Sequence, residues 1–389
     1  MRVTMSTMYN SIQGNLQSLA EDLQRVNISI ASGQKYQRIS DNPVDVGAIL
    51  GLNTENSQTV QYERNLETAK SWLSVTESTL QDISDIVQGS MALANQMATG
   101  TYNASQRQAA AQQIQGYLEE VMQVGNTEFN GQHILAGYRT DAPPFTEGDW
   151  QVQPAVMHLT SGSSGTAVTG GTYTGTASCT YLVEMVSGGG AGAGTYRVST
   201  DGGQNWTDPA VIPAGPINLG NGVQVTLGGT WNAGDRFSIP VYRPIQYQGD
   251  TNNFEIAIGG QNRMVINEVG STAVGGDQGT NDLFQILAQL KSNLEANDSA
   301  EVGASLEKLR SYQAHVTSIM AGLGASLDRV GMKENVYGML KDELTQQISD
   351  RGDTDLIEAV NLLNMKENAY QAALLSSSKV MSMSLMDYL

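Results

Sequence analysis

Two stretches of heptad-spaced apolar residues, one toward each end of the chain, set the strongest limit on how this sequence folds. In both, the apolar positions alternate between steps of three and four, which is typical of helices that pack against another helix. The N-terminal set comprises Met5, Tyr9, Ile12, Leu16, Leu19, Leu23, Val26 and Ile30. The second set comprises Leu306, Leu309, Val316, Met320, Leu323, Leu327 and Val330, with polar Gln313 at one position. The simplest arrangement folds the chain back on itself, so that both ends lie in one helical rod.

Between these helical ends the composition changes sharply. From Asp141 to about residue 280 the sequence is rich in glycine and contains no lysine. Short alternating runs, bounded by turn residues, predict antiparallel strands near 181–183, 196–198, 223–227 and 237–239. We expect a sandwich or small barrel, with loops at 161–175 and 188–194. The order helices–strands–helices predicts a β domain inserted into a helical rod.

The expected fold is therefore mainly α, with a central antiparallel β domain. We expect terminal helices in 1–38 and 354–389, a helical rod domain from 39–140 and 281–353, and the inserted domain in 141–280. A long second helix ends at Gly100 and has its own seam: Leu66, Ala69, Leu73, Thr76, Leu80, Ile83, Val87, Ser90, Ala94 and Met97. Further helices are expected near 105–125, 283–294, 302–348 and 355–386, with a break at 349–354.

Charge and cysteine content exclude several classes of protein. The net charge of −18 and the pI near 4.5 disfavour nucleic acid or an anionic membrane as a partner, because like charges repel. Cys179 is the one cysteine, so the chain cannot form an internal disulfide. No run approaches 18 apolar residues, and no basic region with an apolar core follows Met1, so neither a spanning helix nor a cleavable signal is expected.

The two ends of the chain are unusually poor in charge. Residues 3–20 contain no charged side chain, and between Asn368 and Met386 only Lys379 is charged. Because an unpaired charge removed from water costs several kcal/mol, uncharged faces indicate contact with protein on several sides. A monomeric helical hairpin is the alternative. We interpret the ends as an assembly interface made by Met5, Tyr9, Ile12, Leu16, Leu19, Leu23, Leu363, Tyr370, Leu374, Met381 and Leu385.

Two short segments carry turn signals. Asp41, Asn42 and Pro43 favour a turn followed by a helix start. Asn130 and Gly131 form the Asn-Gly pair typical of a tight hairpin, and Ile134-Leu135-Ala136 reads as the start of a short strand. We interpret these five turn residues as structural.

The motifs that suggest catalysis or ligand binding are weak. Residues 199–206 match the Asp-box pattern Ser-x-Asp-x-Gly-x-x-Trp in a single copy, which predicts a hairpin turn with Trp206 packed beneath it. The Arg-Gly-Asp sequence at 351–353 falls at the expected helix break. His133, His158 and His315 are scattered without metal-ligand spacing. We therefore expect no catalytic, cofactor-binding or metal site, and no enzymatic activity.

Several segments resemble the flagellin family, and within it the branch of hook–filament junction proteins. They are Met1-Arg2-Val3, the turn 39–43, the segment 126–145, residues 353–356 and the closing residues 384–389. Flagellins usually have Asp-Asp-Ala-Ala where this chain has Asp41-Asn42-Pro43-Val44. The run from Ala136 to Phe145 is also closer to the junction branch.

This resemblance implies a structural role outside the cell. Such proteins are exported unfolded by the flagellar type III apparatus and form a ring, with their terminal helices in an inner tube. The implied partners are the first hook-associated protein, flagellin, copies of the same chain and an export chaperone at the C-terminal helix. Flagellin itself is the alternative, and a glycan-binding or hydrolytic surface protein acting through residues 145–280 is a third reading.

Overall fold

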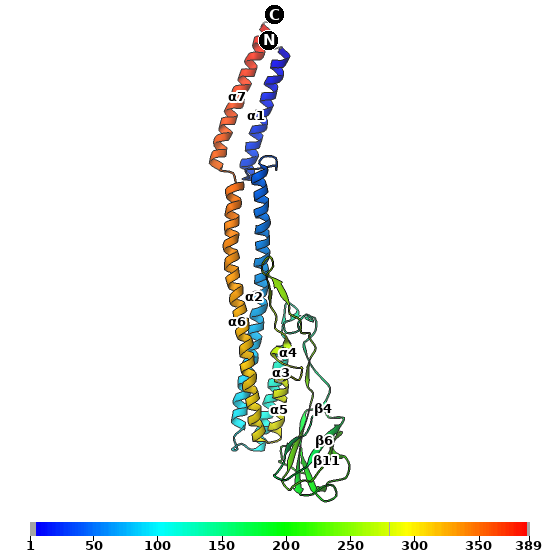
Figure 1. Cartoon of the computed structure of the whole chain (residues 1–389). Coiled ribbons are helices and arrows are strands. Elements are labelled where there is room, and N and C mark those ends of the chain that lie inside the picture. Colours follow the sequence, from blue (N-terminus) through cyan, green and yellow to red (C-terminus); the bar gives the residue numbers. More distant parts are fainter. Residues whose placement is uncertain (1–4, 280, 387–389) are drawn as a thin grey trace. The chain divides into compact units, whose positions relative to one another are not determined.

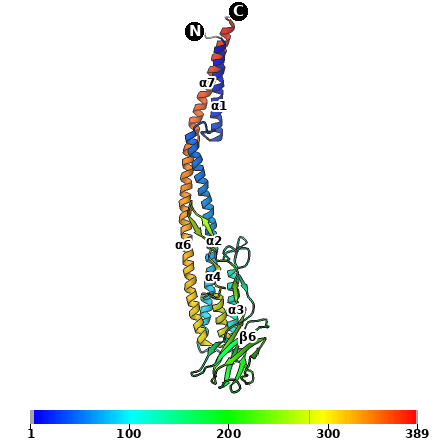
Figure 2. The same cartoon turned by 45° about the vertical axis from the view of Figure 1, so that its right-hand side comes forward.

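The computed structural model describes residues 5–279 and 281–386 (Figures 1 and 2), and the side chains of 5, 6, 8 and 380–386 lie outside that description. Contacts divide the chain into two units, which are considered separately: 1–64 with 333–389, and 65–332. Two long helices, α2 (Pro43–Met97) and α6 (Ser299–Gly352), contribute to both. Within the described residues, no helix is both long enough and apolar enough to cross a bilayer.

A helical bundle forms the first part of the larger unit. It contains the later part of α2, α3 (Ala104–Gly125), α5 (Leu283–Glu295) and the first part of α6, with the short α4 (Gly270–Ala273) beside it. The seam predicted on the second helix is confirmed, because all ten of its residues are at most 5% exposed. Five of the second-set residues are also buried, namely Leu306, Leu309, Val316, Leu323 and Val330.

The polar position in that second set has a specific partner. Gln313 of α6 donates from Nε2 to Ser84 Oγ of α2 at 2.9 Å. A buried polar group without a partner costs roughly 1–3 kcal/mol, so this bond lowers the cost of a polar residue at an otherwise apolar position. The Oε1 atom of Gln313 is also buried and has no hydrogen-bond partner among the described residues. In the larger unit α2 and α6 lie side by side in Figures 1 and 2, and a polar pair of this kind favours one register of two packed helices.

The inserted region is a sandwich of two main sheets. The larger sheet has the order β4-β12-β7-β8-β9 with β5 also paired to β12, and the smaller has the order β10-β11-β6. Their strands are β4 (Gln151–Val152), β5 (Val156–His158), β6 (Thr166–Gly171), β7 (Cys179–Ser187), β8 (Thr195–Ser199), β9 (Ala210–Val211), β10 (Ile217–Gly220), β11 (Val223–Gly228) and β12 (Arg236–Tyr242). Side chains of both sheets share one apolar core around Trp231, Tyr181 and Phe237. The predicted antiparallel β domain is confirmed, and of the two forms expected, sandwich or small barrel, it has the sandwich form.

Three two-stranded ribbons complete the described strands. They pair β1 (Glu128–Phe129) with β2 (Gln132–His133), β3 (Phe145–Glu147) with β13 (Ile245–Tyr247), and β14 (Glu255–Ala257) with β15 (Arg263–Val265). The β3–β13 ribbon contains both crossings of the chain between the bundle and the sandwich. The chain therefore enters and leaves the sandwich through this one ribbon.

Two local predictions are wrong. The expected loop at 161–175 contains β6, which pairs with β11 along its whole length because that pairing outweighs the weak strand preference of its glycines. The expected strand at Ile134–Ala136 is a buried turn. Leu135 O accepts hydrogen bonds from Gly270 N and the Tyr247 hydroxyl, both at 2.9 Å, instead of joining a ladder.

Replacing a seam residue should destabilise the larger unit. We expect Leu80→Ala to lower its free energy of unfolding by about 2–5 kcal/mol, because Leu80 is 0% exposed and truncation leaves a cavity. Leu50→Ala, on the 54% exposed Leu50 of the same helix, is the matched control with little expected effect. Urea unfolding measures both, and equal effects would contradict the assigned seam.

The environment of Asp235, which lies beside β12, indicates that the stability of the sandwich falls at low pH. Its carboxylate accepts from Thr160 N at 2.6 Å, Thr160 Oγ1 at 2.7 Å and Asn232 N at 2.7 Å. Burial would raise its pKa, but hydrogen bonds from Ser163, Thr160 and Asn232 lower it to about 2. Since the unfolded value is about 3.9, this stabilisation is present above pH ~4 and disappears as pH falls through ~2.

We therefore expect the stability difference between the wild type and Asp235→Asn to shrink between about pH 4 and pH 2. Thermal melts of both proteins across that range measure it. A difference that stays constant with pH would show that the Asp235 charge contributes nothing.

Candidate assembly interface

The ends of the chain form a helix pair in the smaller unit. Helices α1 (Met5–Ser32) and α7 (Leu356–Met386) lie side by side (Figures 1 and 2). A backbone clasp joins their inner ends: Thr354 N donates to Gly33 O at 2.8 Å, and Lys35 N donates to Gly352 O at 2.7 Å. The Arg-Gly-Asp segment is thus used by this clasp, and α6 extends through Gly352 instead of breaking at residue 349.

Beyond the clasp, polar side chains also join α1 to α7 and to Thr354 just before it. Lys366 Nζ lies 2.6 Å from Asp22 Oδ2, and its hydrogen bond holds the pKa of the Asp22 carboxyl below its usual range. The Ser29 and Thr354 hydroxyls are 2.7 Å apart. Because the side chains of Lys366 and Asp22 are about one-third exposed, the ion pair contributes on the order of 0–1 kcal/mol.

The 41–43 turn leads from α1 into α2. The Asp41 carboxylate accepts from the backbone N–H groups of Gln37 at 3.0 Å and Arg38 at 2.9 Å, and these bonds lower its pKa. Asn42 accepts from Asp45 N at 3.2 Å, as an N-cap residue does, and Pro43 is the first helical residue.

The second predicted turn belongs to the larger unit. Asn130 and Gly131 have φ of 53° and 75° and connect β1 to β2. Left-handed angles at both positions are what a two-residue hairpin of this twist requires, and Asn and Gly tolerate them best. This turn therefore shapes the larger unit.

The predicted interface residues are only partly covered. On α1, Ile12, Leu16, Leu19 and Leu23 are half-buried, whereas Tyr9 is 54% exposed. On α7 the corresponding residues divide in the same way: Leu363 and Tyr370 are half-buried, and Leu374 is 45% exposed. The side chains of Met5, Met381 and Leu385 lie outside the described residues. No described side chain of α1 is fully buried, so the pair lacks a core of its own.

Apolar exposure is concentrated in this smaller unit. Of the 22 large hydrophobic side chains exposed among the described residues, fourteen lie in 1–64 and 333–389, less than a third of the chain. Seven of them are on α7: Leu356, Ile357, Val360, Leu362, Met365, Leu374 and Leu375. Fully burying one such side chain gains roughly 1.5–3 kcal/mol, so further protein contacts would be strongly favourable.

Several exposed residues were missed in the sequence analysis. Ile357 is 78% exposed and Leu375 is 74% exposed, and neither belongs to the chosen seam. Val336 and Met339 form another exposed apolar pair on α6. The sequence feature that could have identified the exposed residues of α7 is the broad apolar surface of the last helix. A heptad pattern describes one face of a helix and omits apolar residues on the other faces.

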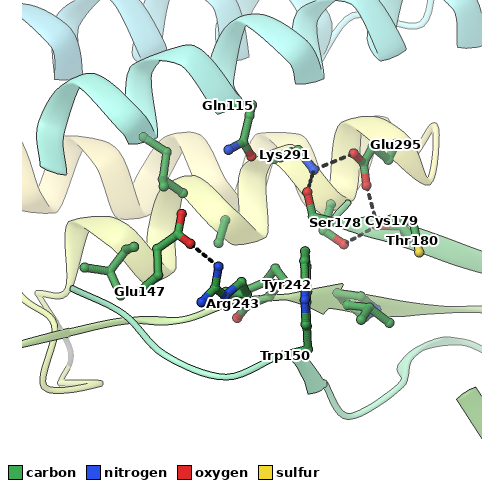
Figure 3. Close-up of a pocket in the computed structure, with 16 residues that line it drawn as sticks. Gln115, Glu147, Trp150, Ser178, Cys179, Thr180, Tyr242, Arg243, Lys291 and Glu295 are labelled. Carbon is green, nitrogen blue, oxygen red and sulfur yellow. Dashed lines mark hydrogen bonds and ion pairs between the residues drawn. The ribbon is translucent and has the colours of Figure 1, made fainter. Parts of the chain in front are cut away.

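The ionic side chains that line one cavity of the larger unit are paired with one another. This cavity lies between α5 and the sandwich (Figure 3), and the pairs are Lys291 with Glu295 at 2.7 Å, and Arg243 with Glu147 at 2.5 Å. Burial raises the pKa of the nearby Cys179 thiol, which disfavours the reactive thiolate.

The histidines have separate structural contacts. His133 Nδ1 lies 2.9 Å from Asn126 O, His158 Nε2 lies 2.7 Å from Asp298 Oδ2, and His315 Nε2 lies 2.9 Å from Thr272 O. Across the part of the chain that the structure describes, no three His, Cys, Asp or Glu residues gather as a metal site would require.

Sequence comparisons point to flagellar proteins. Residues 3–140 match the bacterial flagellin N-terminal helical region. Flagellar hook-associated protein 3 of Salmonella typhimurium is 25% identical over 148 residues, covering 38% of this chain and 47% of that protein. Its namesake in Escherichia coli matches to the same extent. The flagellar filament 41 kDa core protein of Borreliella burgdorferi is 23% identical over 147 residues, covering 38% of this chain and 44% of that protein. The chain thus spans about half the length of the curated relatives it matches.

A solved structure supports the same fold. A flagellar hook-associated protein from Vibrio parahaemolyticus aligns with a TM-score of 0.51 at 14% identity, covering 80% of this chain and 100% of that one. Long terminal helices flanking a central antiparallel β domain therefore define a flagellin-like fold. The chain is therefore similar to flagellin-family proteins in fold, and its residues 3–140 match the N-terminal helical region of bacterial flagellins.

Unequal burial predicts unequal protection of amides in the free monomer. We expect fast hydrogen exchange in residues 9–30, whose described side chains are never fully buried, and slow exchange around the buried seam residues 66–97. The reason is that ordering costs about 1–2 kcal/mol per residue of backbone entropy, which must be offset by burial. Strong protection of 9–30 in dilute monomer would contradict this prediction.

Proposed function

We propose that this chain is a structural subunit of the bacterial flagellum that forms an adaptor ring between the hook and the filament. The observation that carries the proposal is the exposed apolar surface of the α1–α7 pair in a flagellin-like fold. The similarity to proteins named flagellar hook-associated protein 3 supports the position at the hook–filament junction. The subunit is exported to the flagellum and acts without catalysis.

Copies of the same chain are the first proposed partners. Exposed apolar residues occur on several faces of α7, including Ile357, Leu362 and Leu374, so one neighbouring helix could not cover them all. Repeated contacts between different surfaces of identical subunits produce rings or helical tubes. The two faces of the ring would then contact the first hook-associated protein on one side and flagellin on the other.

An export chaperone is the fourth proposed partner. Before assembly, the apolar surface of α7 would be exposed to water and prone to aggregation. A helix with this surface suits a helix-in-groove partner. The chaperone would cover the same residues that later contact neighbouring subunits.

Flagellin itself is the second candidate function. The match to a flagellar filament core protein over 147 residues favours it. Self-assembly separates the two, because a flagellin polymerises alone into long filaments and a junction protein does not. Electron microscopy of the purified, concentrated chain would decide between them.

Deletion of the gene in its native bacterium tests the proposed role. We expect cells with intact hooks but no filaments, and flagellin shed into the medium. Complementation with the intact gene restores filaments. Filaments of normal length and number on deleted cells would overturn the proposal.

Point variants test whether the α1–α7 surface carries the assembly. Ile357→Asp and Leu375→Asp, at exposed apolar positions of α7, should reduce filament number at least roughly tenfold, because burying an unpaired carboxylate costs several kcal/mol and each ~1.4 kcal/mol is tenfold. Val211→Asp is the matched control, since Val211 is an exposed apolar residue of the sandwich. Filament counts equal in all three strains would contradict the assigned surface.

A further inference from the structure

The β sandwich of the larger unit is self-sufficient in apolar packing. Every residue of its buried core lies between Tyr173 and Val241, and the partly buried residues packed against that core all lie within 150–219. No side chain of the helical bundle belongs to this set. The sandwich therefore does not depend on the bundle for its core.

Specific polar contacts join the sandwich to the bundle. Near the start of β7, Thr180 donates to Glu295 Oε2 at 2.7 Å and lies 3.0 Å from Ser292 Oγ, both on α5. Lys291 of α5 donates to Ser178 Oγ at 2.7 Å (Figure 3). A second contact joins His158 of β5 to Asp298, which precedes α6, at 2.7 Å.

The Asp-box-like turn supplies a third contact. Internally, Asp201 accepts from Asn205 N at 2.9 Å and Ser199 Oγ accepts from Gly203 N at 2.9 Å, which fixes the loop. Its exposed tip points Gln204 at α3: Gln204 Nε2 donates to Gln108 Oε1 at 2.9 Å, and Ser105 donates to Gln204 Oε1 at 2.7 Å.

Gly202 of the same turn permits a close approach to the bundle. Its φ is +71°, and a Cβ at this position would lie 2.7 Å from the backbone oxygen of Glu295. The motif thus faces the helices of its own chain.

Between these contacts the interface of the sandwich with the bundle is incompletely packed. The cavity in Figure 3 has a volume of about 70 Å³ and a mixed polar and apolar lining. One water needs roughly 10–15 Å³ of such volume, so the cavity has room for several. An interface with polar contacts and room for water resembles the interfaces across which domains move.

We propose that the sandwich is a movable domain, held on the bundle by a polar latch. The latch consists of the Asp-box-like turn together with Thr180 and His158. The β3–β13 ribbon is the pivot, because both chain crossings pass through it. When the latch opens, the sandwich changes its direction relative to α3 and α5 while the buried helical seams stay intact.

Distance measurement between paired spin labels tests this proposal. Non-cysteine labels at the exposed positions Asn218 in the sandwich and Ser311 on α6 leave Cys179 unchanged. In the otherwise native chain we expect one narrow distance distribution. In a variant carrying His158→Ala, Thr180→Val and Gln204→Ala, we expect a broader distribution that includes new distances.

A label pair inside the sandwich provides the control for folding. Asn218 and Val186 should keep one narrow distance in both proteins, which shows that the sandwich remains folded when the latch is removed. An Asn218–Ser311 distribution that stays narrow in the latch variant would overturn the proposal. A distribution already broad in the native chain would overturn it equally, since the latch would then hold nothing.

Discussion

The two helical parts of this structure differ in how much of their apolar helix surface is buried by other helices of the same chain. In the bundle of α2, α3, α5 and α6, four helices surround the seams and leave residues such as Leu66 and Ile83 with no exposure. In the α1–α7 pair, two helices meet and leave Tyr9 and Leu375 largely in water. The same heptad pattern thus yields a closed core in one unit and an open surface in the other.

This difference links the fold to the proposed role. Helices without a complete core keep apolar surface that can bind neighbouring copies, whereas the buried core of the bundle stabilises the fold of each single chain. The scarcity of charge at the chain ends agrees with this, because a buried unpaired charge would oppose association. In the sandwich, by contrast, the apolar core is made by residues of the sandwich alone, and hydrogen bonds and an ion pair are among its contacts with the helices.

Periodicity predicted the helices well because buried seams leave a regular signature. The ten positions from Leu66 to Met97 could be identified from spacing alone, and the alternating runs at 223–227 and 237–239 are strands. Local patterns failed where pairing partners are distant. β6 is a strand because β11 lies beside it, and Leu135 forms a turn because its carbonyl is bonded by Gly270 and Tyr247. The Asp-box-like turn was identified as a hairpin, but its contact with α3 could not follow from spacing.

Thermal unfolding of this chain at low concentration, followed by circular dichroism at the helical wavelength, tests the central claim most directly. The account predicts a gradual early loss of the signal of the terminal helices, followed by one cooperative transition of the bundle. Association into larger assemblies should move the early loss up into the later transition. A single cooperative transition that includes all helical signal in dilute monomer would show that the α1–α7 pair is complete without neighbours.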